Sequence, residues 1–202
     1  MKRIENNRLT SNNIVNKILI ANLQENDMIA VEYASYGTIN RKCINVVLDE
    51  FKENRLTKEE CHFVFDKQFH LSDKILSMGV FEVIALIPTD YRLDLLIQHH
   101  SWQVRNELAR FNKYTELLKN DENFNVRITV AKCGHCLDTL VHDRSISVRE
   151  EVAKHHYRLD LLANDPNWIV RRVVAESGYA SRLFQKDESS EVRRVAKESQ
   201  KK

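Results

Sequence analysis

Two thiols stand at metal-ligand spacing in the segment CGHC, where two residues separate Cys133 from Cys136 and His142 follows shortly after. The C-x-x-C spacing serves zinc sites and thiol–disulfide chemistry. A single pair is a weak indication of either, and both cysteines fall at turn positions that vary freely among the repeats defined below. We therefore predict no metal and no cofactor. A metal or redox role through Cys133 and Cys136 is a third hypothesis, behind the two given at the end of this subsection.

Other sets of catalytic residues are absent from the sequence. It contains no glycine-rich phosphate loop, no H-E-x-x-H and no G-x-S-x-G, and its 4 glycines exclude the common nucleotide-binding loops. The double histidines, His99-His100 and His155-His156, occupy different positions of the repeat, so they do not point to one shared site. These absences predict a protein that is not an enzyme.

A column of arginines is the most regular candidate for phosphate binding. Val-Arg pairs recur every 22 residues, and their arginines are Arg105, Arg127, Arg149, Arg171 and Arg193. The last four each follow an aspartate by six residues, at Asp121, Asp143, Asp165 and Asp187. Carboxylates at this constant spacing predict a structural ladder of Asp–Arg hydrogen bonds that joins adjacent repeats. Arg105 has His99 in place of the aspartate and is the candidate for a free arginine.

These columns belong to a repeat of 22 residues. The hexapeptide YRLDLL occurs at 91–96 and at 157–162, a separation of 66 residues or three steps of 22. Each repeat divides into a first helix with a Leu-Leu segment and a second helix that carries the Val-Arg pair. One repeat buries too few apolar side chains to fold alone, so the repeats must stack into one core. We assign five repeats, at 89–110, 111–132, 133–154, 155–176 and 177–198.

The segment DPNW marks the start of one second helix, with Asp165 predicted as the N-cap and Pro166 as the first helical residue. The surrounding pattern D-P-x-x-x-V-R-x-x-V-A, at 165–175, resembles HEAT-like repeats, and the short period is similar to that of the variant leucine-rich repeat. The resemblance covers residues 89–202 and implies a short, gently curved α-solenoid. It indicates architecture rather than activity, because unrelated scaffolds, adaptors and a few enzymes share it.

Composition also predicts an all-α protein. Apolar residues make up 43% and charged residues 30% of the chain, whereas there are only 4 Gly and 2 Pro. The net charge of +2 implies neither nucleic acid nor an acidic surface as partner. No signal peptide or membrane span is visible, and the 4 cysteines are predicted to be reduced. We predict a cytoplasmic protein without membrane contact, and the abundance of Asn, Lys and Ile is typical of an AT-rich microbial or phage genome.

The N-terminal region, residues 1–88, does not follow the repeat. Helices are predicted at 11–23, at 43–53 and from Thr57, where T-K-E-E forms a capping box. The apolar run at 78–88 leads into the repeats and suits a degenerate extra repeat. We predict that this region is a helical cap over the open end of the stack, with a separate binding head as the alternative.

The second helices also carry the candidate binding residues. A column that begins with Arg110 and Lys132 ends with Glu176 and Glu198, so it is not uniformly basic. Opposite charges stand four residues apart at Glu150–Lys154, Arg172–Glu176 and Arg194–Glu198, which predicts local ion pairs over much of this face. A small positive spot remains on the face that such solenoids make concave. We predict that a partner binds there, at Arg105, Arg110, Lys132 and the variable positions Asn106 and Ile128.

A column of large apolar residues precedes the Val-Arg pairs, at Trp102, Phe124, Ile146 and Trp168. In a solenoid such a column is predicted to be core between repeats. If the tryptophans were exposed instead, they would be anchor residues of an interface.

The preferred hypothesis is a non-enzymatic scaffold, an adaptor or an inhibitor, that binds another protein through its concave face or its N-terminal region. Nucleic-acid binding is the alternative, with the HEAT-like alkylpurine DNA glycosylases as its enzymatic extreme. Those enzymes use a basic concave groove that holds aromatic residues. Here the charge is nearly neutral and both tryptophans are predicted to lie in the core, so the similarity is limited to the repeat.

Overall fold

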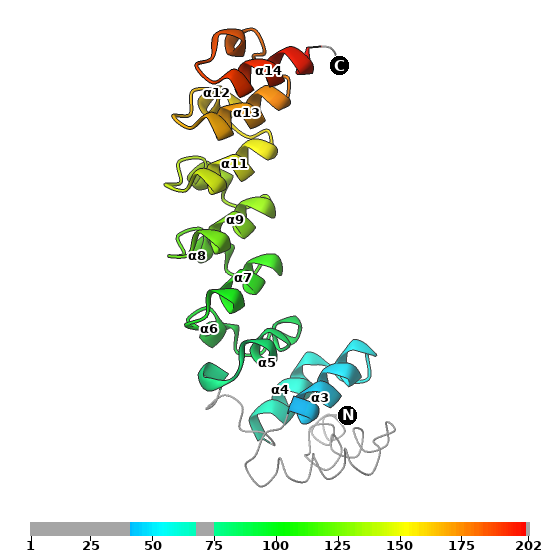
Figure 1. The fold of residues 1–202 in the computed structure, drawn as a ribbon. Helices are drawn as coiled ribbons and strands as arrows, with labels where there is room; N and C mark the ends of the chain where they lie inside the picture. The colour runs from blue at the N-terminus through cyan, green and yellow to red at the C-terminus, as the bar shows by residue number, and fades with distance from the viewer. Residues whose placement is uncertain (1–40, 68–74, 201–202) are drawn as a thin grey trace. The chain divides into compact units, whose positions relative to one another are not determined.

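The computed structural model describes residues 41–67 and 75–200, and every regular element in these ranges is a helix (Figure 1). The predicted all-α class is thereby confirmed for the described residues. The chain divides into two compact units, Met1–Glu107 and Leu108–Lys202, and each is considered by itself. The domain boundary predicted after residue 88 lies inside the first unit.

The first unit contains four described α-helices and two 3₁₀ turns: α3 (Arg41–Lys52), α4 (Lys58–Lys67), η3 (Ile75–Ser77), α5 (Val80–Ile84), η4 (Ile87–Thr89) and α6 (Leu93–Leu96). Helix α3 confirms the prediction at 43–53, whereas the helix predicted at 11–23 lies outside the described residues. The predicted capping box is confirmed. The N–H of Thr57 donates to Oε2 of Glu60 at 3.0 Å, and the N–H of Glu60 donates to Oγ1 of Thr57 at 3.2 Å.

The core of the first unit forms around the tyrosine of the first YRLDLL. Tyr91 is buried, and its ring meets that of Phe65 edge-on at 5.0 Å between centroids. Its hydroxyl donates to Oδ1 of Asp66 at 2.6 Å, so the polar end of the buried side chain is satisfied. Leu86 and Ile87, from the apolar run before the repeats, are fully buried as well.

The second unit follows the 22-residue period in its elements. Helix α7 (Trp102–Arg110) spans the division between the units and is followed by α8 (Thr115–Leu118), α9 (Phe124–Lys132), α10 (Leu137–Leu140), α11 (Ile146–Lys154), α12 (Leu159–Leu162), α13 (Trp168–Glu176), η5 (Leu183–Lys186) and α14 (Ser190–Ser199). The longer helices α9, α11, α13 and α14 pack against one another in this order. They form a row in Figure 1, with the short helices along one side.

The buried face of the row comes from the residue types that repeat. In α9 the inward residues are Val126, Arg127, Val130 and Ala131. Helix α13 buries the same four positions, whereas α11 buries three of them and leaves Arg149 half-buried. The short helices contribute a buried residue at every 22nd position, namely Leu118, Leu140, Leu162 and Phe184, all at most 2% exposed. Since each helix is too short to be stable alone, this shared burial is what keeps it folded.

Backbone geometry separates the helices of each repeat. The residue before each of α8, α10 and α12 is left-handed, with φ of 55° at Tyr114, 55° at Cys136 and 46° at Arg158, and it turns the chain sharply. Longer helices start at an N-cap such as Asn167, whose side chain accepts the N–H of Ile169 at 2.9 Å.

The predicted start of α13 is wrong by two residues. The N-cap is Asn167 rather than Asp165, and Pro166 precedes the helix, which begins at Trp168. The carboxylate of Asp165 accepts the N–H of Asn167 at 2.8 Å and also binds Arg149, so it is engaged outside the helix. A D-x-N segment therefore holds the turn, and the asparagine caps the helix.

Candidate functional site

The arginine column forms a ladder of bidentate ion pairs. Arg127 binds Asp143, Arg149 binds Asp165, and Arg171 binds Asp187, each through Nε at 2.7–2.8 Å and Nη2 at 2.9–3.0 Å. The partner aspartate lies sixteen residues after the arginine, in the next repeat. The aspartate six residues before it contributes only its backbone carbonyl, which accepts from Nη1 at 2.6–2.8 Å. The predicted ladder between repeats exists, but its carboxylates come from the following repeat.

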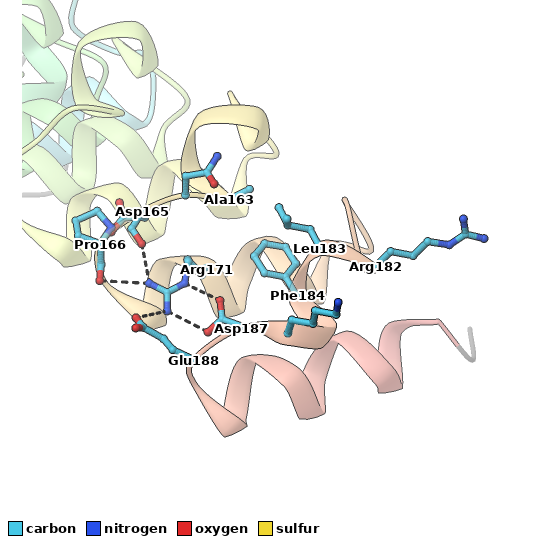
Figure 2. A pocket seen from close by; sticks show the side chains of 11 residues that line it. Ala163, Asp165, Pro166, Arg171, Arg182, Leu183, Phe184, Asp187 and Glu188 are labelled. Carbon is cyan, nitrogen blue, oxygen red and sulfur yellow. Dashed lines mark hydrogen bonds and ion pairs between the residues drawn. The ribbon is translucent and has the colours of Figure 1, made fainter.

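The ladder explains why these arginines are not open anion sites. Arg171 uses all five of its N–H donors, on Asp187, on Glu188 and on the carbonyls of Asp165 and Pro166 (Figure 2). Hydrogen bonding to Asp187 is the main reason why the pKa of the Arg171 guanidinium is raised and that of the Asp187 carboxyl is lowered. A phosphate would have to displace these bonds, so Arg127, Arg149 and Arg171 join neighbouring repeats and are not open to an anion.

Arg105 is not the free arginine that we predicted. Arg105 is only 8% exposed, and its Nη1 donates to the carbonyls of His99 at 2.7 Å and His100 at 3.2 Å. His99 itself is fully buried, and its Nδ1 accepts the N–H of Ser101 at 3.1 Å. Burial of the imidazole is the main reason why the pKa of His99 is lowered. The histidine therefore stands in the aspartate position as a neutral packing residue.

The other predicted binding residues lie on the outward side of their helices. Arg110 and Lys132 are exposed, whereas Asn106 and Ile128 are half-buried. Lys132 makes no ion pair within residues 41–67 and 75–200. The three predicted pairs at i,i+4 are all present, between Lys154 and Glu150, Arg172 and Glu176, and Arg194 and Glu198. These local pairs leave the outward surface of α11, α13 and α14 close to neutral.

The apolar column is exposed in the second unit, against our prediction that it is core. Phe124, Ile146 and Trp168 are 47%, 37% and 43% exposed, and we call these three residues the apolar row. Each is the first residue of a longer helix. Buried residues follow it at two, six and seven positions, and the ladder arginine at the third position lies on the same face. At about 100° per residue the first residue is then roughly a quarter turn away from the centre of the buried face. A helical wheel drawn from the Val-Arg and Val-Ala positions would have revealed this exposure.

An open groove of about 710 Å³ lies between the loop after α12 and the segment around η5 (Figure 2). Ala163 and Asp165 line one side, Leu183 and Asp187 the other, and Arg171 crosses between them. A second groove, of about 480 Å³, is lined by residues at equivalent positions two repeats earlier, including Arg127 and Asp143. A groove therefore lies beside two of the Arg–Asp pairs, Arg127–Asp143 and Arg171–Asp187.

The two thiols of the CGHC segment contact different groups. The thiol of Cys133 lies 3.8 Å from the carbonyl oxygen of Ala109, whereas that of Cys136 lies 3.3 Å from Oε1 of Glu116. Burial, reinforced by Glu116, raises the pKa of Cys136 to about 11. Within the described ranges no group of three or more His, Cys, Asp or Glu side chains is arranged to hold a metal. The role of CGHC in metal or redox chemistry stays an untested hypothesis.

Comparisons with known proteins do not assign the chain to a family. No protein-family model, no curated protein and no solved structure matches it. Among the helices in residues 41–67 and 75–200, none combines the length and the apolar character needed to cross a membrane.

Proposed function

We propose that the chain is a short α-solenoid of five 22-residue repeats and acts as a non-enzymatic scaffold, an adaptor or inhibitor, that binds another protein. The observation that carries this proposal is the exposed apolar row. Three large apolar side chains, Phe124, Ile146 and Trp168, stand at the same position of consecutive longer helices and remain 37–47% exposed. Scattered exposed apolar residues are normal, but an aligned set is the usual anchor of a protein interface.

The spacing of the row suggests the form of the partner. Packed helices lie about 8–10 Å apart, so the side chains of the row recur at about that distance. An extended chain places every third residue at a similar spacing, since each residue rises about 3.3 Å. A helix does so with every seventh residue, at about 1.5 Å per residue. The proposed partner therefore presents a ridge of apolar side chains repeating at about 10 Å.

Two of the predicted binding residues extend the row on α9. Ile128 and Lys132 follow Phe124 by four and eight residues, so all three lie on one side of the helix. Arg110 remains a candidate because it is exposed, whereas Arg105 is too buried to offer its guanidinium. Asn106 belongs to the first unit and is not part of the surface proposed here.

The charge on this surface favours a protein over nucleic acid. Three outward cations of α11, α13 and α14 are paired with glutamates on their own helices, namely Lys154, Arg172 and Arg194. Binding to a phosphate backbone depends on cations that neutralise phosphates, and it weakens steeply with salt. An apolar row flanked by neutralised charges is better suited to a contact that depends on buried apolar surface.

The test is affinity capture from the native host with the full-length chain as bait, before and after nuclease treatment. The wild type is compared with the triple variant Phe124→Ser, Ile146→Ser, Trp168→Ser. The matched control is Leu117→Ser, Leu161→Ser, Leu183→Ser, which removes three leucines that are 61%, 37% and 56% exposed on the short helices. Both variants lose similar exposed apolar surface, so a difference between them reports the face used.

We expect a stoichiometric protein that survives nuclease, is lost with the row variant and is retained by the leucine control. Binding that disappears with nuclease and falls steeply with salt would replace this proposal with nucleic-acid binding. A partner retained by the row variant, and lost instead with Lys132→Glu and Arg110→Glu, would move the site to the basic spot. Circular dichroism of each variant shows that loss of binding is not loss of fold.

A further inference from the structure

Among the ladder arginines in residues 108–200, Arg193 alone has no carboxylate bound to it by a described residue. Its Nη1 donates to the carbonyls of Asp187 at 2.5 Å and Glu188 at 3.0 Å, as in the preceding repeats. Its Nε and Nη2 have no hydrogen-bond partner among residues 41–67 and 75–200. The fork that elsewhere holds an aspartate of the next repeat is therefore held in place but unfilled, and the residue is partly exposed.

Three filled copies of this site define the ligand that it fits. In each copy the aspartate binds the arginine fork bidentately at 2.7–3.0 Å. The same carboxylate accepts the backbone N–H two residues later, at 2.7–2.8 Å, where a serine or asparagine stands before a helix. The ligand is thus an aspartate in a D-x-S or D-x-N turn that leads into a helix.

The surface around Arg193 lacks the apolar residues that join the internal repeats. Ser190 stands where the preceding helices have the residues of the apolar row, and Lys197 stands where they have a buried alanine; both are exposed. The neighbouring Arg194 is already paired with Glu191 and Glu198. A partner that binds the outer side of α14 would therefore make mainly ionic and hydrogen-bonded contacts. Arg193 can contribute to them through Nε–H and Nη2–H.

A second copy of the chain does not supply the missing group through its own repeats in register. In a head-to-tail stack of two copies, the first repeat of one copy would follow the last repeat of the other. Its residue facing Arg193 would be His99, which stands where the other repeats have aspartate. His99 is fully buried and its lowered pKa keeps the ring neutral, so it offers no anion. Neither the described residues nor the first repeat of a second copy therefore supplies this carboxylate.

We infer that the C-terminal helix α14 carries a docking site in which Arg193 binds an aspartate from the D-x-S or D-x-N helix start of a partner protein. The site is separate from the apolar row and does not depend on it. It uses the same two donors, Nε and Nη2, that close the three internal pairs, so the partner extends the ladder by one step. The two parallel N–H donors of a guanidinium match the two oxygens of a carboxylate, a geometry that the ammonium group of a lysine does not offer.

The test is a titration of the ¹⁵N-labelled full-length chain with a capped tetrapeptide, Asp-Glu-Ser-Ser, that copies residues 187–190. We expect saturable shifts of the Arg193 Nε–H signal and of nearby backbone amides of α14. The matched peptide Asn-Glu-Ser-Ser keeps every other group and is expected to bind at least about tenfold more weakly, which corresponds to about 1.4 kcal/mol. This comparison uses the wild-type chain and so does not depend on any variant folding.

Two protein variants complete the test. Arg193→Lys keeps the charge but removes the fork, and is expected to weaken the aspartate peptide by a similar factor, whereas Arg194→Lys is expected to bind normally. Equal shifts with both peptides, or equal effects of both variants, would mean that Arg193 is an ordinary solvated cation and would overturn the inference. Concentration-dependent shifts with a dimer in sedimentation, abolished by Arg193→Lys, would assign the fork to a second copy and overturn the foreign partner.

Discussion

The Arg149–Asp165 pair joins two consecutive repeats and allows the ladder to be tested directly. Nε and Nη2 of Arg149 bind the carboxylate at 2.7 and 3.0 Å, and the two side chains are 13% and 3% exposed. Replacing Asp165 by Asn keeps the size of the side chain and its bond from the N–H of Asn167. It removes the negative charge and turns an N–H donor toward the guanidinium. The cation is then left with poor compensation in a mostly dry site.

The expected cost follows from this burial. Removing one partner of a buried ion pair costs about 3–5 kcal/mol. The retained bond from Asn167 and the residual exposure of Arg149 reduce the expected cost of Asp165→Asn to just below that range, about 2–3 kcal/mol. Arg149→Met also leaves the carbonyl of Asp143 without its Nη1 donor, which lies at 2.7 Å in the wild type. The double variant has neither an unpaired cation nor an unpaired carboxylate at this site. Its loss of unfolding free energy should therefore be smaller than the sum of the two single losses, by a coupling energy of about 2 kcal/mol.

The assay is urea unfolding followed by circular dichroism for the wild type, the two single variants and the double variant. The control cycle uses Arg194 and Glu198, which are 56% and 57% exposed and are expected to show no measurable coupling. If the buried pair couples no more strongly than this exposed pair, the ladder does not hold the repeats together and the reasoning is refuted. A changed slope of the unfolding transition would show instead that the repeats no longer unfold together.

Three further predictions follow from local geometry. At pH 8 iodoacetamide should label Cys133, which is exposed, well before Cys136. The pKa of about 11 at Cys136 lowers its thiolate fraction about 100-fold relative to a thiol at the reference value of 9.0. Peptide mass spectrometry gives the two labelling rates. Gly178→Ala should destabilise the chain by about 1 kcal/mol in urea unfolding, since φ is +81° and no atom would clash with the added Cβ. The pKa of Asp187 is lowered chiefly by its hydrogen bond to Arg171. The ionised carboxylate therefore stabilises the fold above its unfolded pKa of about 3.9, and this stabilisation is lost as the pH falls through the lower folded pKa. Below about pH 4 the melting temperature of Asp187→Asn should depend less on pH than that of the wild type.

Much of the fold could be predicted because its signals are local. Low Gly and Pro content, the Val-Arg period and the alternation of Leu-Leu and Val-Arg segments predict helices at a 22-residue step, and α9, α11, α13 and α14 begin at that step. The capping box at Thr57 and the ion pairs at i,i+4 were predictable for the same reason, since both partners lie within one turn of the chain. The start of α13 was not, because Asp165 and Asn167 are both good caps and a contact with Arg149 decides between them.

The sequence by itself determined which residues recur and therefore which side chains share a role. It did not determine which members of two columns meet. Arg149 has Asp143 six residues before it and Asp165 sixteen after it, and only stacking of the repeats shows that the later carboxylate completes the pair. The same holds for Phe124 and Trp168, whose size favours the core but whose position at the first turn of the helix leaves them 47% and 43% exposed. Period and composition are properties of the chain, whereas pairing and exposure depend on how one repeat packs on the next.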